Sequence, residues 1–426
     1  MRRAVLAVVG LLSLALLAFA TSPGSAADDP RPTVRILYFR AQDDPLDQAL
    51  LAAFEEGLTD VRLWYGRQVG KTFRFDILID VVGRKTVAAY CADLGCQPAS
   101  EWGAAFRAVV AELEERGYVD RSDPHSVYIV AVQTYEISST MGDPGGPWFS
   151  SDGGGVSIVG RQVLLDIAAG CGDDCTVRNR ALGMIAHELG HAFNLPHPHE
   201  DVYSQGRDPC DEHCSQTVMW AYPAYPAVGL LDTAEHPEKE ALRRSPFFSL
   251  DVRTVHLEAG WNLVSLPLRP EAAAARSILS SLQEQWDVVY AWNARTSRWL
   301  SFFPGRGGTL DRLDETRGFW VHMKREAILS VVGEPAGPVS IPLVAGWNLI
   351  GYPADEPLPV AEALASIDGR YDAVYSWAAS AGSWRLYIPG LGFSTLQEMT
   401  PGRAYWVHAT SDAVLTVNEA AFSASP

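Results

Sequence analysis

The stretch HELGHAFNLPH, residues 187–197, places three histidines and a glutamate at a spacing that suits metal binding. On a helix, positions i and i+4 lie about one turn apart on the same face. His187 and His191 can therefore direct both imidazoles at one metal ion. Glu188 stands beside them, placed to act as a base that does not itself ligate the metal. The stretch predicts a helix that binds a metal ion with a carboxylate next to it.

A third histidine can join this pair only if the helix ends and the chain turns back. His197 lies too far beyond His191 to share its helix face. Asn194 suits the end of the helix, because asparagine is, after glycine, the residue best tolerated in the left-handed conformation. Three histidine nitrogens leave a fourth tetrahedral position for water, which is the pattern of a catalytic zinc rather than a structural one. The stretch thus predicts a zinc-dependent hydrolase, and first of all a protease.

These residues resemble the metzincin metallopeptidases, whose signature HExxHxxGxxH is followed downstream by a methionine-containing turn. Asn194 stands where the family usually has glycine, and Met219 in SQTVMWAYPAYP (215–226) is the candidate for the methionine turn. The resemblance covers roughly residues 33–245 and is specific in these two motifs only. The matching signature residues are His187, Glu188, His191 and His197.

The resemblance implies a role for each of these side chains. The three histidines would hold one catalytic Zn²⁺, and Glu188 would act as the general base toward a water molecule. Met219 would form an apolar floor beneath the imidazoles without ligating the metal. His199 competes with His197 for the place of third ligand, but its spacing fits the motif less well.

Two further family features transfer less directly. Some metzincins carry a tyrosine two residues after the methionine, a position that is Ala221 here. Tyr222 and Tyr225 lie nearby, and we expect them to pack in an aromatic loop rather than to take part in catalysis. In the family, the edge strand before the zinc helix lines the substrate cleft. By position, residues 156–166 would form that strand.

Composition indicates an ordinary folded protein. The chain has 426 residues, 47% of them hydrophobic and 20% charged, so two or three domains are expected. Its net charge of −17 argues against nucleic acid or an anionic membrane as a partner.

The N-terminus predicts export. Arg2 and Arg3 precede an apolar stretch over residues 4–20, and Ser25-Ala26-Ala27 offers a cleavage site before Asp28. A second cleavage site would be Ala18-Phe19-Ala20. An uncleaved membrane anchor is the alternative, although the apolar run is short for a spanning helix. We therefore expect a signal peptide at 1–27, a secreted mature chain and no integral membrane span after its removal.

The six cysteines fall in three close pairs, as expected of an exported chain with disulfides. Local pairing is one of fifteen connectivities. A second zinc site built from Cys210, His213 and Cys214 is the alternative for the last pair. The pairs are Cys91 with Cys96, Cys171 with Cys175, and Cys210 with Cys214.

Strands and helices alternate ahead of the zinc motif, an order similar to that of the N-terminal part of a metzincin. Apolar periodicity predicts strands at 33–40, 73–79 and 126–135 and helices at 45–69 and 101–116. The run 155–169 predicts one or two short strands. Asp174 or Thr176 is expected to cap the zinc helix.

From about residue 252 the chain repeats itself. AGWNLVSLP (259–267) returns as AGWNLIGYP (345–353), and DVVYAW (287–292) returns as DAVYSW (372–377). GFWVH likewise recurs as AYWVH, with His322 and His408 in equivalent places. Two tandem modules of strands and tight turns are the economical interpretation, and motifs of the GWNL type resemble repeats of bacterial secreted and surface proteins.

Eight tryptophans occupy equivalent positions in the two modules and admit two interpretations. As core residues they would give each small module a large apolar side-chain volume, and this is the interpretation we favour. As an exposed surface they could stack on sugars or contact a partner chain at a cell surface. The pairs are Trp261 with Trp347, Trp292 with Trp377, Trp299 with Trp384, and Trp320 with Trp406.

The sequence therefore predicts an α+β multidomain protein. A metzincin-like domain with a mixed twisted sheet and a zinc helix would span 28–250, and β-rich modules would span 252–336 and 337–420. The expected function is that of a secreted zinc endopeptidase acting on proteins or peptides. The alternatives are a surface binding protein with a relic zinc site and a zinc amidase that acts on cell-wall peptides.

Overall fold

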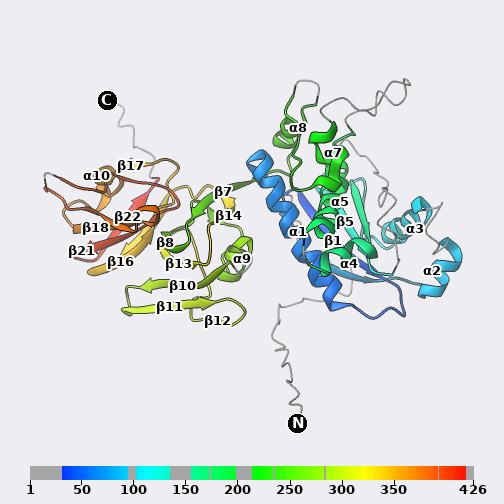
Figure 1. Cartoon of the computed structure of the whole chain (residues 1–426), viewed down its shortest axis with the longest axis horizontal. Coiled ribbons are helices and arrows are strands. Elements are labelled where there is room, and N and C mark those ends of the chain that lie inside the picture. Colours follow the sequence, from blue (N-terminus) through cyan, green and yellow to red (C-terminus); the bar gives the residue numbers. More distant parts are fainter. Residues whose placement is uncertain are drawn as a thin grey trace, which may run out of the picture. The chain divides into compact units, whose positions relative to one another are not determined.

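The computed structural model shows a mixed α+β protein (Figure 1). The chain divides into two compact units. The first unit comprises residues 1–55 and 75–209, and the second comprises residues 56–74 and 210–426. The structure describes residues 31–94, 102–134, 155–171, 174–197, 214–233, 236–282, 285–391 and 393–418. The predicted signal peptide lies outside these residues.

The first unit is built on a parallel sheet. Strand β1 (Thr33–Arg40) lies between β4 (Ile79–Val82) and β5 (Ser126–Val132), and β5 pairs with β6 (Val156–Gly160). Every residue of β5 and β6 is buried, as expected of parallel strands covered on both faces. The strands predicted at 33–40 and 126–135 are confirmed.

The predicted helices of this region are confirmed as α1 (Gln48–Val69) and α3 (Trp102–Glu115). Helix α2 (Val87–Leu94) lies between them in the chain. One face of the sheet forms a core with α3, in which Phe39 and Tyr90 meet edge to face at 5.8 Å between ring centroids. Helix α1 runs across the boundary between the two units.

One strand prediction is wrong, and a second holds only for its first half. The expected strand at 73–79 is divided between β3 (Arg74–Phe75) and β4, and Ile77 between them is 66% exposed. The run 155–169 forms β6 and then helix α4 (Arg161–Ala168). Val163, Leu164 and Ile167 are all buried at helical spacing, and an apolar run of this length does not by itself distinguish a strand from a helix.

The second unit begins with the latter part of α1 and with β2 (Lys71–Thr72), which pairs with β7 (Leu250–Leu257). Two short helices, α7 (Val218–Ala221) and α8 (Glu238–Arg244), precede β7. Phe73 packs edge to face on Phe248 at 5.4 Å, so the segment 56–74 shares a core with the chain just before the repeats.

The residues predicted as two modules contain equivalent antiparallel sheets (Figure 1). The order is β11-β10-β13-β8 in the first and β19-β18-β21-β16 in the second. A strand pair lies beside each sheet, β7 with β14 (Ala327–Glu334) and β15 (Val339–Leu343) with β22 (Ala413–Val417). The sheet strands are β8 (Gly260–Val264), β10 (Trp286–Asn293), β11 (Arg298–Phe303), β13 (Phe319–Met323), β16 (Gly346–Gly351), β18 (Tyr371–Ala378), β19 (Ser383–Tyr387) and β21 (Ala404–Ala409).

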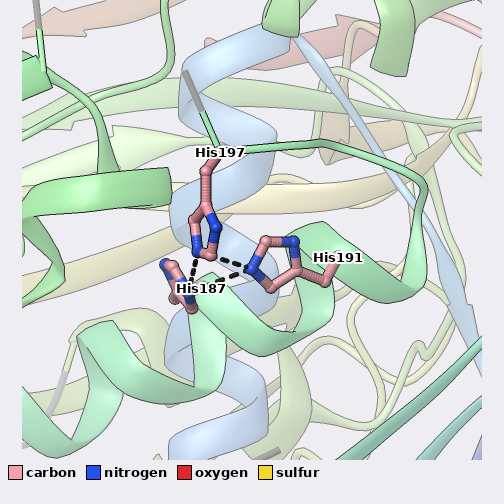
Figure 2. Close-up of side chains that lie close together, drawn as sticks. All are labelled: His187, His191 and His197. Atoms are coloured by element: carbon pink, nitrogen blue, oxygen red, sulfur yellow. Dashed lines mark hydrogen bonds between the residues drawn. The ribbon is translucent and has the colours of Figure 1, made fainter. Parts of the chain in front are cut away.

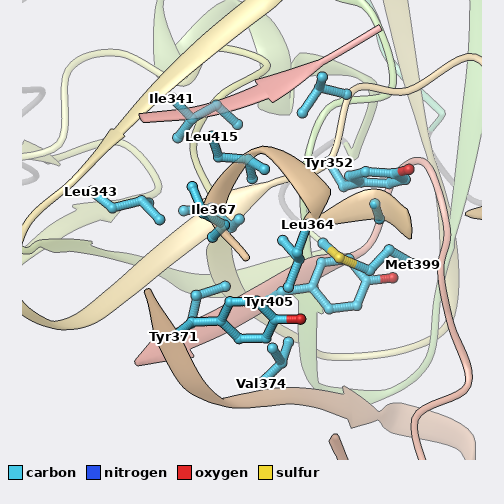
Figure 3. Close-up of a cluster of buried hydrophobic side chains, with 14 of the residues drawn as sticks. Ile341, Leu343, Tyr352, Leu364, Ile367, Tyr371, Val374, Met399, Tyr405 and Leu415 are labelled. Carbon is cyan, nitrogen blue, oxygen red and sulfur yellow. The ribbon is translucent and has the colours of Figure 1, made fainter. Parts of the chain in front are cut away.

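Each of these sheets covers its own hydrophobic core. Helix α9 (Ala275–Leu279) lies on the first core, and α10 (Val360–Ala363) lies on the second. Figure 3 shows the second core, where Leu364 and Ile367 face Tyr371 and Tyr405 of the sheet. No helix among the described residues is long and apolar enough to cross a membrane.

The prediction that all eight repeated tryptophans are core residues is wrong for half of them. Trp261, Trp299, Trp347 and Trp384 are 41–48% exposed. The other four are half-buried and line a cluster between the modules. The first core is instead filled by aliphatic residues with Phe319 and the unrepeated Trp286, and the second by aliphatic residues and tyrosines. The face of each sheet that carries the repeated tryptophans remains partly open.

Candidate metal centre

Helix α5 (Thr176–Ala192) carries the histidine motif and packs against β6 and α4. Its N-cap is Cys175 rather than the predicted Asp174 or Thr176, and the Asp174 carboxylate accepts a hydrogen bond from the Thr176 N–H at 2.8 Å. The predicted disulfide between Cys171 and Cys175 is present directly before the helix. The other two predicted pairs, at 91/96 and 210/214, lie outside the residues whose side chains are described.

The helix ends in the turn that the sequence predicted. Asn194 adopts a left-handed conformation with φ of 68°. The Asn194 N–H donates to the His191 carbonyl at 2.7 Å, and the Leu195 N–H donates to the Gly190 carbonyl at 2.9 Å. These two hydrogen bonds define a Schellman motif, which closes the helix and reverses the chain. The reversal returns His197 toward the helix.

Three imidazoles converge after this turn (Figure 2). His187 and His191 extend from α5, and His197 reaches them from the loop. The Nε2 atom of His191 lies 3.1 Å from Nε2 of His187 and 3.1 Å from that of His197, and the remaining Nε2–Nε2 distance is 3.3 Å. Among the described residues this is the single group of three or more ligand-type side chains close enough to share a metal ion.

Hydrogen bonding alone does not account for this triangle of nitrogens. A neutral imidazole carries one N–H, so three contacts among three Nε2 atoms would need three protons and would then leave no acceptor. In addition, His191 Nδ1 lies 2.8 Å from the Leu195 carbonyl oxygen, which can only accept a hydrogen bond. Nδ1 therefore carries the proton of His191, and its Nε2 presents a lone pair to the centre of the triangle.

The geometry fits a tetrahedral zinc site. Zinc–nitrogen bonds of about 2.0–2.1 Å in a tetrahedron place neighbouring nitrogens about 3.3–3.4 Å apart. The measured separations of 3.1–3.3 Å are close to this value. The Leu195 carbonyl also supplies the outer hydrogen bond that commonly orients a ligating histidine. His187, His191 and His197 can therefore hold a zinc ion and leave one coordination position open.

Burial favours the ligating form of the central histidine. Burial, together with the neighbouring His187 and His197, lowers the pKa of His191 to about 3. A neutral imidazole is the form that binds a metal. His187 is also buried, whereas His197 is half-buried.

The remaining predicted site residues lie on defined elements. Glu188 follows His187 on α5 and is buried, with 4% of its surface exposed. Met219 is fully buried in α7, within the second unit, and its role beneath the imidazoles stays a prediction. Tyr225 is buried and packs on Trp64 at 5.5 Å between ring centroids, as a packing residue would. His199 and His213 lie outside the described residues.

A buried carboxylate that the sequence does not predict holds the segment around Met219. Both carboxylate oxygens of Glu238 lie within 2.9 Å of the Thr217 hydroxyl, and the Leu231 N–H donates to one of them at 2.7 Å. The Thr217 hydroxyl in turn accepts from the Met219 N–H at 3.1 Å and caps α7. Burial raises the pKa of Glu238, while its hydrogen bonds to Leu231 and Thr217 oppose the rise. A lone glutamate in a charged stretch gives no sign of this role in the sequence.

No protein-family model matches the chain, and no curated protein matches it either. Solved structures that resemble it include wild-type OgpA from Akkermansia muciniphila in two crystal forms. One is 13% identical and covers 90% of this chain and 95% of that chain, with a TM-score of 0.33. The other is 17% identical and covers 92% and 100%, with a TM-score of 0.33.

A third similar structure is catalytically inactive OgpA in complex with an O-glycopeptide (glycodrosocin) substrate. It is 14% identical and covers 87% of this chain and 95% of that chain, with a TM-score of 0.30. TM-scores this low do not establish a common fold. A function for this chain therefore has to rest on the three-histidine centre.

Proposed function

We propose that this protein is a zinc-dependent endopeptidase. The observation that carries the proposal is the triangle of Nε2 atoms from His187, His191 and His197, with Glu188 next to His187 in the sequence of the same helix. Three neutral nitrogen ligands with an open fourth position are typical of a catalytic zinc, whereas structural zinc sites are closed by four protein ligands. The metzincin resemblance of the motif supports the same class.

Each residue of the centre would have a distinct part in peptide hydrolysis. Zinc, when bound, supplies a water of lowered pKa and polarises the substrate carbonyl. The three histidines hold the ion, and the hydrogen bond from His191 Nδ1 to Leu195 fixes the ring that stands between the other two. Glu188 takes the proton of the attacking water and passes it to the leaving amine.

The N-terminal pattern of Arg2, Arg3 and the apolar stretch after them supports action outside the cell. We propose protein or peptide chains as substrates, as the metzincin resemblance of the motif implies. The two C-terminal modules would then serve as accessory parts of a secreted enzyme, with the catalytic part in the residues before about 250.

The Glu188→Gln substitution tests the mechanism. The purified chain without residues 1–27 should cleave casein or gelatin, lose activity with a chelator and regain it with zinc. Glu188→Gln should bind zinc as the native protein does, because the imidazoles are untouched, yet lose about 10²–10⁴-fold in turnover because no general base remains. Bound zinc is measured by metal analysis, and turnover with a quenched fluorescent peptide library.

A matched control is Glu112→Gln on α3. Glu112 is half-buried and hydrogen-bonded to Tyr90, so the same change of carboxylate to amide is made far from the histidines in the chain. This variant should keep full activity. Loss of zinc in Glu188→Gln would show that Glu188 is a ligand. A zinc-loaded native chain that cleaves no protein or peptide would refute the protease, and release of stem-peptide fragments from peptidoglycan would favour the amidase.

A further inference from the structure

The tryptophan face of each C-terminal sheet is an exposed aromatic surface. In the first module, Trp261 pairs with His322 across β8 and β13, and Trp292 pairs with Trp299 across β10 and β11. In the second module, Trp347 pairs with His408, and Trp377 pairs with Trp384. The outermost indoles, Trp261, Trp299, Trp347 and Trp384, are 41–48% exposed.

The two modules meet through these faces in a reciprocal arrangement. The indole N–H of Trp292 donates to the Trp347 carbonyl at 3.0 Å, and the equivalent Trp377 donates to the Trp261 carbonyl at 3.0 Å. The same exchange occurs in the backbone, where Ser265 N–H donates to the Gly402 carbonyl and the equivalent Gly351 N–H donates to the Thr316 carbonyl. A contact in which equivalent residues exchange partners is isologous, as in a two-fold dimer. Tandem duplication has here produced a two-fold pair within one chain.

This contact makes two equivalent aromatic patches, each built from both modules. In the first patch, Trp320 stands 6.1 Å from Trp261 of its own module and 5.7 Å from Trp384 of the other. In the second patch, Trp406 stands 6.3 Å from Trp347 and 5.8 Å from Trp299. A single module would supply only part of either patch.

A polar pair borders each patch. His322 Nδ1 lies 2.7 Å from an Asp287 carboxylate oxygen, and the His322 ring lies 4.8 Å from the Trp261 ring. In the second module, His408 Nδ1 lies 2.6 Å from Asp372, and its ring lies 4.8 Å from Trp347. The two aspartates are about half exposed, at 47% and 57% of their side-chain surface. Each indole is therefore flanked by hydrogen-bonding groups that solvent or a ligand can reach.

We propose that the two patches bind a neutral glycan chain, one sugar ring on Trp261 and another on Trp347. A pyranose has an apolar face of C–H groups and a rim of hydroxyls, which match a flat indole beside a carboxylate and an imidazole. The net charge of −17 opposes nucleic acid and acidic glycans. The two-fold duplication of the site suits a polymer with repeating units, because two weak contacts on one chain gain from effective concentration.

The test uses the full mature chain and three soluble neutral probes: chitohexaose, cellohexaose and mannohexaose. We expect at least one probe to quench tryptophan fluorescence and to bind with heat release in calorimetry. Trp261→Ala and Trp347→Ala should each weaken binding of the hexamer about tenfold or more, and the double variant should abolish it. Both tryptophan variants should cleave short peptides as the native protein does. A loss of glycan binding with unchanged peptidase activity would therefore test this proposal independently of the proposed endopeptidase function.

Asp287→Asn and Asp372→Asn keep the shape of exposed side chains and so avoid any loss of folding. Each should weaken the same binding roughly tenfold, because a hydrogen bond to a charged group is lost. Phe393→Ala, which removes a 77% exposed aromatic ring elsewhere in the second module, should have no effect. Failure of all three probes to bind, or binding that persists in the double tryptophan variant, would overturn the proposal. Binding of a polypeptide to the patches that none of the three glycan probes displaces would also overturn the proposal.

Discussion

The left-handed turn at Asn194 connects the fold to the metal centre and can be perturbed at a single side chain. Its Schellman motif returns His197 to the helix and places the Leu195 carbonyl against His191. Asn194→Val puts a β-branched residue at φ of 68°, a conformation that asparagine tolerates and that should cost valine roughly 1–2 kcal/mol. Zinc binding requires the turn to be closed. The strain should therefore lower either zinc affinity or the stability of the metal-free protein, and the two losses together should come to about 1–2 kcal/mol.

If the turn is open in the metal-free variant, the strain arises only when zinc binds. Zinc affinity should then be about 5- to 30-fold weaker. Competition with a chromogenic chelator measures the affinity, and urea unfolding of the metal-free protein measures the stability. Asn194→Gly should change zinc affinity by less than about threefold, because glycine adopts the same conformation without strain.

Ser297→Val is a matched control. Ser297 also has a positive φ, of 50°, in the turn between β10 and β11. The Ser297→Val variant should lose about as much stability as Asn194→Val, with no change in zinc affinity. The reasoning fails if Asn194→Val binds zinc as tightly as the native protein and is equally stable, or if Asn194→Gly loses as much as Asn194→Val does.

Three further outcomes follow from the structure. His197→Ala should lower both bound zinc and turnover, whereas His199→Ala should do neither; the reverse result in metal analysis would move the third ligand two residues along. Because burial raises the pKa of Glu238, its protonation stabilises the fold below its ordinary pKa of 4.5, and this stability is lost as pH rises through the higher folded value. Glu238→Gln should flatten that decline in urea unfolding at a series of pH values, and an unchanged slope would contradict the assignment. Gly155→Ala would place a Cβ 2.2 Å from the Ala192 carbonyl oxygen at the end of α5, so it should cost about 1–3 kcal/mol and weaken zinc binding, and a native melting temperature would show that the backbone yields freely.

The histidine spacing and Asn194 were enough to predict the helix, its left-handed end and the convergence of three imidazoles, because each depends on local backbone geometry. The Leu195 carbonyl could not be predicted as a partner of His191, since any residue offers a carbonyl at that position. The apolar run 155–169 predicts the strand at 156–160 but not the helix that follows it, because a short buried helix and a buried strand carry the same apolar residues. The exposure of four repeated tryptophans cannot be predicted either, because alternation along a strand does not show which of two apolar faces is covered.

The predicted division of the chain near residue 250 illustrates a further limit of sequence patterns. Arg62 pairs with Glu271 at 2.5 Å, and Arg74 pairs with Glu334 at 2.5 Å, so acids of the first repeated module hold arginines from the region expected to be catalytic. Strand β2 pairs with β7, and a Cβ on Gly66 would meet Val252 at 2.4 Å. Apolar periodicity in α1 indicates that the helix has a buried face but not which later segment covers it. A chain cut near residue 250 would leave β2 without its partner strand and both arginines without their acids. The first module therefore contributes to the stability of segment 56–74, even though the histidines that would perform the chemistry all lie in the other unit.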